Sequence, residues 1–171
     1  MNHRTVFAAI GLALAAATAG PAAASAVDAN TGQLATFEGR TFDMSRGWGK
    51  ATACNITDTG ASCYRDETEM NRAIAANPPE TRASNCSTSL RLYDGIGQTG
   101  AVISLSARGT LLSLSAYGFD NRTSSYLVGA CSSTFYSGIA TGVYGGNTSA
   151  NAAASSMLSG WDNVVSSVFI S

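Results

Sequence analysis

Short apolar runs separated by turn-forming residues fill the chain from residue 86 to residue 171. Between the runs lie Asp-Gly, Gly-Gln-Thr-Gly and Arg-Gly sequences, which are typical turn signals. The apolar positions are Leu90, Leu92, Val102, Ile103, Leu105, Leu111, Leu112 and Leu114. Short strands at intervals of about 8–12 residues are typical of an all-β sandwich. We therefore expect an all-β domain over residues 86–171, in which the small-residue tract 147–156 forms a loop.

Residues 27–85 show a weaker pattern, which predicts a small α+β appendage. Apolar and polar residues alternate weakly around residues 35–37 and 41–42. Further along, Thr57-Asp58-Thr59-Gly60 has the composition of a tight turn. We expect a hairpin at this turn, which would bring the two flanking segments side by side.

A helix of about three turns is predicted over residues 65–76. Met70 and Ile74 are four residues apart and would share one face of this helix. Asp66 can cap the first turn, with Glu69 three positions later as in a capping box. Two prolines follow the segment and would end the helix.

The first 26 residues have the pattern of a cleavable secretory signal. Arg4 supplies a positive start, an apolar stretch runs over residues 6–19, and Ala24-Ser25-Ala26 fits the small-residue rule for cleavage. The apolar stretch is shorter than the ~20 residues that span a bilayer. We therefore expect a secreted, extracellular protein whose mature chain begins after residue 26.

Composition narrows the function classes open to the mature chain. The single histidine, His3, lies in the predicted signal, so the mature chain has no histidine for Ser-His-Asp or Cys-His catalysis. The chain has ten basic side chains, including Arg4, and eleven acidic ones. This balance gives no excess of positive charge of the kind that binds nucleic acid. The sequence contains no basic amphipathic helix of the kind that attaches a protein to a membrane surface. We expect a non-enzymatic protein that binds neither nucleic acid nor membrane.

Four cysteines lie in the predicted mature chain: Cys54, Cys63, Cys86 and Cys131. An even number in an exported chain predicts two disulfides, and four cysteines allow three pairings. The Cys54–Cys63 pairing is favoured because the predicted hairpin joins their flanks. The remaining pair would then be Cys86–Cys131.

An internal repeat divides residues 86–171 into two units. Residues 118–125 (GFDNRTSS) recur as residues 160–167 (GWDNVVSS), and residues 92–96 (LYDGI) recur in part as residues 135–139 (FYSGI). Each unit has about 40 residues and is too small to bury a sheet face alone. We therefore expect the two units to pack face to face.

Acidic side chains are scarce in this repeated part of the chain. Residues 86–171 contain only Asp94, Asp120 and Asp162, and the last two occupy the same position of the repeated segment. Such a placement singles out the two Asp-Asn-x-x-Ser-Ser segments, which we call corner 1 (residues 120–125) and corner 2 (residues 162–167).

Both corners resemble the (N/D)(N/D)xx(S/T)S signature of microbial βγ-crystallin domains. The family's other hallmark is an aromatic residue, four residues, a second aromatic, one residue and a glycine, and only part of it is present. Gln98 and Ala140 stand at the second aromatic position, between Tyr93 and Gly100 and between Phe135 and Gly142. The resemblance implies a two-motif Greek-key sandwich. Residues 92–125 also resemble the secreted actinobacterial metalloproteinase inhibitors, which share this fold.

The resemblance to calcium-binding βγ-crystallins implies an ion site at each corner. Calcium prefers hard oxygen ligands, which Asp, Asn and Ser supply. One half-site would be Asp120, Asn121 and Ser124, and the other Asp162, Asn163 and Ser166. Each would be completed by a backbone carbonyl of the opposite unit's early loop, around Asp94 or Ser137. Ser125 and Ser167 would brace the corners through backbone hydrogen bonds. The same side chains also close turns without any metal, and that alternative stays open.

The resemblance also suggests a function for the secreted domain. We expect a monomeric, calcium-binding protein that inhibits an extracellular proteinase, through residues 55–62 or residues 128–132. A purely structural calcium module and an antimicrobial or toxin-like protein are the alternatives.

Overall fold

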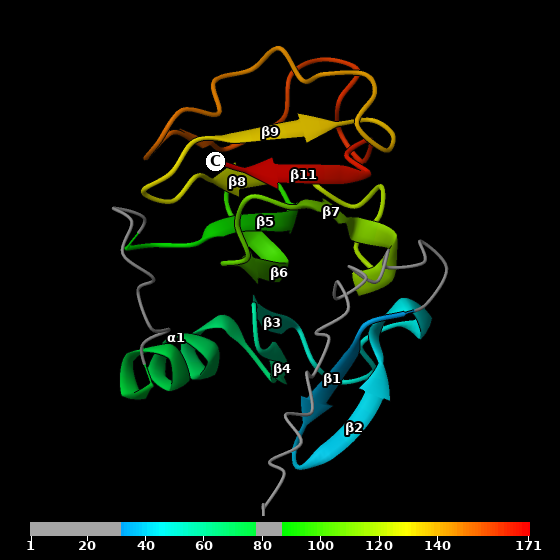
Figure 1. Ribbon diagram of the computed structural model, residues 1–171, viewed down its shortest axis with the longest axis vertical. Coiled ribbons are helices and arrows are strands. Elements are labelled where there is room, and N and C mark those ends of the chain that lie inside the picture. The colour runs from blue at the N-terminus through cyan, green and yellow to red at the C-terminus, as the bar shows by residue number, and fades with distance from the viewer. Residues whose placement is uncertain (1–31, 78–86) are drawn as a thin grey trace, which may run out of the picture.

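A computed structural model describes residues 32–77 and 87–171. The predicted signal segment, residues 1–26, lies outside these ranges. Within them the chain forms two β-sheets, one α-helix and two short 3-10 helices (Figure 1). No helix in the described ranges has the length and apolar character to cross a membrane.

The first unit of the repeat contributes three strands to the larger sheet. Its strands β5 (Leu90–Gly95) and β6 (Thr99–Leu105) form an antiparallel hairpin, and β8 (Ser125–Leu127) returns to pair with the other side of β5. The second unit repeats this plan in the other sheet. There β9 (Ser133–Tyr136) pairs with β11 (Ser167–Ile170), and Val143 bridges back to Tyr136.

The third strand of each unit crosses to the other unit's sheet. Strand β7 (Leu111–Ser113) leaves the first unit and pairs with β11, whereas β10 (Ala153–Ala154) leaves the second unit and pairs with β8. A hairpin followed by a crossing strand and a returning strand is a Greek key. The predicted fold class, an all-β two-motif Greek-key sandwich, is confirmed. The tract 147–156 is not entirely a loop, because β10 lies within it.

The N-terminal strands continue the first unit's sheet. Strand β3 (Ala53–Thr57) runs parallel to β6, and β4 (Gly60–Tyr64), β1 (Leu34–Phe37) and β2 (Arg40–Asp43) follow it outward. The result is an eight-stranded sheet in the order β10-β8-β5-β6-β3-β4-β1-β2. Figure 1 shows β1 to β4 at one end of the molecule and the repeated units at the other. The appendage predicted from the sequence therefore shares a sheet with the repeat.

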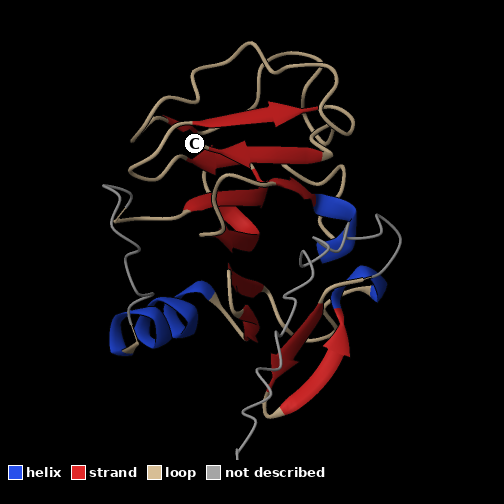
Figure 2. Cartoon of the chain, viewed as in Figure 1, coloured by secondary structure: helices blue, strands red, loops and turns tan. Residues whose placement is uncertain are grey.

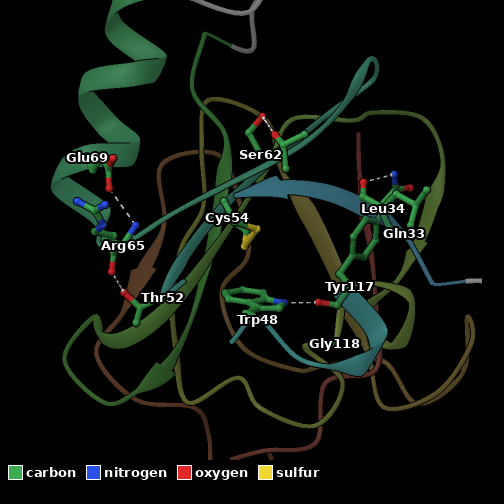
Figure 3. The surroundings of a disulfide bond; sticks show 12 residues. Gln33, Leu34, Trp48, Thr52, Cys54, Ser62, Arg65, Glu69, Tyr117 and Gly118 are labelled. Atoms are coloured by element: carbon green, nitrogen blue, oxygen red, sulfur yellow. Dashed lines mark hydrogen bonds between the residues drawn. A yellow bond between two sulfur atoms is a disulfide. The ribbon is translucent and has the colours of Figure 1, made fainter. Parts of the chain in front are cut away.

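The predicted hairpin and its disulfide are both confirmed. Thr57 pairs with Gly60 across a two-residue turn, and Cys54 lies directly opposite Cys63 with a Cα–Cα distance of 4.0 Å. Figure 3 shows this bond beneath the sheet, near Trp48. Cys131 is also disulfide-bonded. Its predicted partner, Cys86, lies outside the described residues.

The predicted helix is α1 (Glu67–Ala76), shown in blue at one side of the sheet in Figure 2. Asp66 caps it by accepting a 2.8 Å hydrogen bond from the Glu69 amide. Met70 is fully buried and packs against Ala53, Tyr93 and Val102 on the outer face of the sheet. Loss of the Asp66 cap would cost about 1 kcal/mol of stability.

An ion pair and a hydrogen bond from a tyrosine hydroxyl hold α1 to strand β5. Glu67 accepts hydrogen bonds from the Tyr93 hydroxyl at 2.8 Å and from the Arg91 guanidinium at 2.7 Å. Burial and the hydrogen bond to Glu67 raise the pKa of Tyr93 to about 12. The Tyr93 phenol is therefore a neutral donor at ordinary pH, and it orients the helix on the sheet.

A single apolar core lies between the sheets. It joins residues of the N-terminal strands, such as Cys54 and Ile56, to Leu92 and Ile103 of the first unit and to Val168 of the second. The rings of Tyr126 and Phe135 meet edge to face across the two units, with centroids 5.0 Å apart. The two units therefore pack face to face as predicted, and the N-terminal strands share their core.

Candidate functional site at the paired corners

The second residue of each corner is an asparagine in the left-handed region of backbone space. The φ angles are +53° at Asn121 and +56° at Asn163. Asparagine tolerates this conformation better than other non-glycine residues because its short amide can hydrogen-bond locally. Each amide does so, since Nδ2 donates to the Oδ2 of the preceding Asp120 or Asp162 at 3.3 Å and 3.2 Å.

The two corners are bound directly to each other. The backbone amide of Asn121 donates a hydrogen bond to the Val165 carbonyl, and the backbone amide of Asn163 donates one to the Thr123 carbonyl, both at 3.0 Å. Equal distances in the two directions show that the corners are related by a pseudo-twofold axis. They form one composite site rather than two separate ones.

Side chains also pair across the axis. Ser124 of corner 1 donates to the Asp162 carboxylate at 2.6 Å and lies 3.5 Å from the Asn163 amide oxygen. Ser166 of corner 2 donates to the Asn121 amide oxygen at 3.3 Å. The oxygen ligands are thus grouped as a serine from one corner with the Asp-Asn pair of the other. The sequence had suggested groups within a single corner.

Asp120 carries an acceptor without a partner. Its Oδ1 is buried and receives no hydrogen bond from the residues that the structure describes, whereas the equivalent oxygen of Asp162 accepts a hydrogen bond from the Ser124 hydroxyl. A buried acceptor without a donor costs about 1–3 kcal/mol, and more when it is charged. The oxygens of Asp120, Asn121 and Ser166 are hard ligands of the kind that calcium prefers, so this set fits the ion.

Asp94, which the sequence placed beside the second unit's corner, is engaged elsewhere. Its carboxylate accepts hydrogen bonds from the Ala101 amide and from the Arg122 guanidinium, both at 2.6 Å. The pair neutralises both charges inside the first unit. Ser137 occupies the equivalent position of the second unit, where its amide donates to the Gly142 carbonyl at 2.9 Å. Neither side chain is hydrogen-bonded to an Asp-Asn pair.

Ser125 and Ser167 form backbone hydrogen bonds, as predicted. Each hydroxyl donates at 2.6 Å to a carbonyl at the tip of its own unit's hairpin, Gly95 or Gly138. Each hydroxyl also accepts a hydrogen bond from a backbone amide of the same tip: Ser125 from Gln98 at 3.0 Å and Ser167 from Ala140 at 3.4 Å. These serines therefore tie each corner to the folded hairpin of its unit.

Trp48 covers corner 1 and was not predicted as part of the site. Its ring stacks on Phe119 with centroids 5.4 Å apart, and its Nε1 donates to the Tyr117 carbonyl at 2.7 Å (Figure 3). The Arg122 guanidinium lies over both rings, 5.4 Å and 4.9 Å from their centroids. No local sequence signal reveals this cover, because Trp48 lies about 70 residues before the corner.

The two loops considered for proteinase binding differ in form. Residues 57–60 make a tight turn with an exposed tip at Asp58 and Thr59. Val128 and Gly129 are buried, and both are tied to residues 151–152 by backbone hydrogen bonds. Neither is an extended, open loop, and proteinase inhibition stays a prediction. Across residues 32–77 and 87–171 no three His, Cys, Asp or Glu side chains cluster as a metal site.

Comparison with known proteins gives a limited result. No protein-family model and no curated protein sequence matches the chain. One similar solved structure is a βγ-crystallin from Ciona intestinalis, with 19% identity and a TM-score of 0.42. The match covers 48% of this chain and 99% of that protein. The strand order and the exchange of third strands, rather than this likeness, define the fold described above.

Proposed function

We propose that this chain is a non-enzymatic binding protein of the βγ-crystallin type, which takes up calcium at the paired corners. The observation that carries the proposal is the buried Asp120 Oδ1, an acceptor without a donor. A cation would supply the missing partner and would do so where a second unit already contributes oxygen ligands. The signal-like residues 1–26 support export to the extracellular space, where free calcium is abundant.

The residues that would hold the ion come from both corners. Asp120 and Asn121 would act with Ser166, whose hydrogen bond to Asn121 is long at 3.3 Å. Asp162 and Asn163 would act with Ser124, whose hydroxyl would first have to release Asp162. Calcium bound in this way would supply positive charge that links the two units. With one carboxylate in each set, the dissociation constant should be in the range ~10⁻⁵–10⁻³ M of extracellular modules.

Calcium titration by calorimetry tests this proposal. We expect saturable binding to the wild-type protein, and loss of that binding in the double variant Asp120→Asn, Asp162→Asn. The matched control is Asp58→Asn at the exposed hairpin turn, which should leave the affinity unchanged. Binding should also raise stability, by about 2.7 kcal/mol at a calcium concentration 100 times the dissociation constant.

Two results would contradict calcium binding at the corners. One is no heat of binding up to ~10 mM calcium, which exceeds the weakest constants of such modules. The other is binding that survives in the double variant. Either result would leave the corners as turn structures that join the two units.

A further inference from the structure

A row of polar side chains crosses the outer face of the eight-stranded sheet. Residues directly opposite one another on neighbouring strands share a face of a sheet. The strand register places six such residues in line: Thr41, Thr36, Ser62, Asn55, Ser104 and Arg91. Their neighbours along the strands, such as Ala35, Cys54 and Ala61, point inward to the core. Because side chains alternate between the two faces of a strand, this row of the outer face is polar, whereas the part of that face under α1 is apolar.

Two adjoining hollows follow this row. One, with a volume of about 410 Å³, lies over β1, β3 and β4 and is lined by Thr36, Thr57 and Ser62. The second, also about 410 Å³, lies beside the C-terminal half of α1, where Ile74 and Arg91 line it. Asn55 lines both hollows, and we treat the two hollows together as one candidate surface. We call this the outer groove.

Asn55 has an acceptor without a partner at the centre of the outer groove. Its Oδ1 is buried and receives no hydrogen bond. On one side it faces Ser62, whose hydroxyl is shared with Thr36 at 3.3 Å, and on the other side Ser104, which is paired with Ser89 at 2.7 Å. This oxygen has almost no accessible surface, so a donor from a ligand or from solvent can reach it only if the Asn55 amide rotates toward the groove.

The chemistry of the outer groove favours a neutral ligand. Its polar lining consists of hydroxyls and one amide, apart from Arg91, whose guanidinium already binds Glu67 and Asn71. An anion or a strongly charged peptide would find no free counter-charge there. Apolar contacts come from Leu34, which is 59% exposed, and from Ile74 and Leu127 at the other end.

We propose that the outer groove binds a neutral oligosaccharide. Sugar hydroxyls both donate and accept, so they can pair with the serine and threonine hydroxyls of the groove and with the Asn55 amide. Sugar C–H faces can pack on the apolar residues. Neighbouring strands are about 4.8 Å apart, which is comparable with the length of one sugar ring. A chain lying across β2, β1, β4 and β3 would therefore meet Thr41, Thr36, Ser62 and Asn55 in turn, and all four line the first hollow. This binding does not depend on calcium at the corners.

Binding to a panel of neutral oligosaccharides tests the proposal. Hexamers of β-1,4-linked glucose, β-1,3-linked glucose, α-1,4-linked glucose and β-1,4-linked N-acetylglucosamine would be titrated into the full mature chain, with a calcium chelator present. We expect one hexamer to bind with a dissociation constant of millimolar or below. Asn55→Leu and Ser62→Val should each weaken it at least tenfold, with thermal unfolding as a check that the variants fold.

Two controls separate the outer groove from other surfaces. Ser132→Ala removes an exposed hydroxyl outside the groove and should leave the affinity unchanged. The corner double variant Ser124→Ala, Ser166→Ala should also bind the sugar normally, whether or not the corners bind calcium.

Several outcomes would overturn the oligosaccharide proposal. One is no binding by any hexamer at millimolar concentration. Another is binding that is equally strong in folded Asn55→Leu and Ser62→Val variants. A third is a dimer in sedimentation experiments that dissociates in the Asn55→Leu variant, since the groove would then be covered by a second copy of the chain.

Discussion

Corner 1 and corner 2 have the same sequence pattern but different surroundings. Asp120 is partly buried and Ser124 buried, whereas the equivalent Asp162 is exposed and Ser166 partly buried. The aromatic residues before the corners also differ in their partners: Phe119 stacks on Trp48 of the N-terminal segment, whereas Trp161 meets Tyr144 of its own unit. A repeated motif therefore does not guarantee two equal sites.

The variable positions of the corners differ in keeping with this cover. Corner 1 has Arg122, which pairs with Asp94 and lies over the Trp48 ring, and corner 2 has Val164 in the same place. Ser137 replaces Asp94 in the second unit, so neither charge has a counterpart there. The comparison indicates that corner 1 is a joint between the N-terminal strands and the repeat, as well as a candidate ion site.

The largest effect is expected from removing the cover. Trp48→Ala deletes a buried ring and its hydrogen bond to Tyr117, and should lower the free energy of unfolding by about 3–5 kcal/mol. Trp161→Ala is the matched change at the uncovered corner. Its ring is only partly buried and meets Tyr144 edge to face at 5.0 Å, so we expect a loss of about 1–2 kcal/mol. Denaturant unfolding measures both, and equal losses would show that the two corners are equally supported.

A smaller effect is expected at the glycines that precede the corners. Gly118 and Gly160 both have left-handed backbones, with φ of +63° and +79°, so alanine is strained at either position by about 1 kcal/mol. A Cβ on Gly118 would also overlap the Met44 carbonyl, whereas a Cβ on Gly160 meets nothing within 4 Å. We expect Gly118→Ala to cost about 3 kcal/mol and Gly160→Ala about 1 kcal/mol. Thermal unfolding of the two variants would sharpen the comparison, and a reversed order would refute it.

The smallest effect is expected from making corner 1 resemble corner 2. Arg122→Val removes the ion pair with Asp94 and the contact with Trp48, and should cost about 1 kcal/mol of stability. It also removes a positive charge close to the proposed calcium ligands. We therefore expect calorimetry to show a severalfold tighter calcium dissociation constant. The control is Arg46→Val, whose charge is 86% exposed and pairs with Asp43, and which should change neither quantity.

Local features of the fold could be predicted from the sequence. The Thr57–Gly60 turn, the Cys54–Cys63 bond and helix α1 with its Asp66 cap depend on residues close together in the chain. The two-unit plan was visible because the duplication repeats the same strand and corner signals. Each of these features is encoded by a few neighbouring side chains.

Long-range pairing could not be predicted in the same way. Nothing in the composition of β3 indicates that it pairs with β6, so the N-terminal strands were expected as an appendage rather than as part of the sheet. The same limit applies to the site. The six corner residues were identified, but the pairing of Ser124 with Asp162, and of Asp94 with Arg122, depends on how distant segments meet.

The exchange of third strands has a consequence for how the chain folds. Strand β3 can form its pairing with β6 only once β6 is available, and β6 follows it by about 50 residues in the sequence. In the same way, β7 can pair only once β11 is available. Contacts so far apart in sequence are slow to form, because long loops must close before any pairing stabilises them. Most of the described chain must therefore be present before either sheet is complete, and we expect both sheets to form together in one cooperative step.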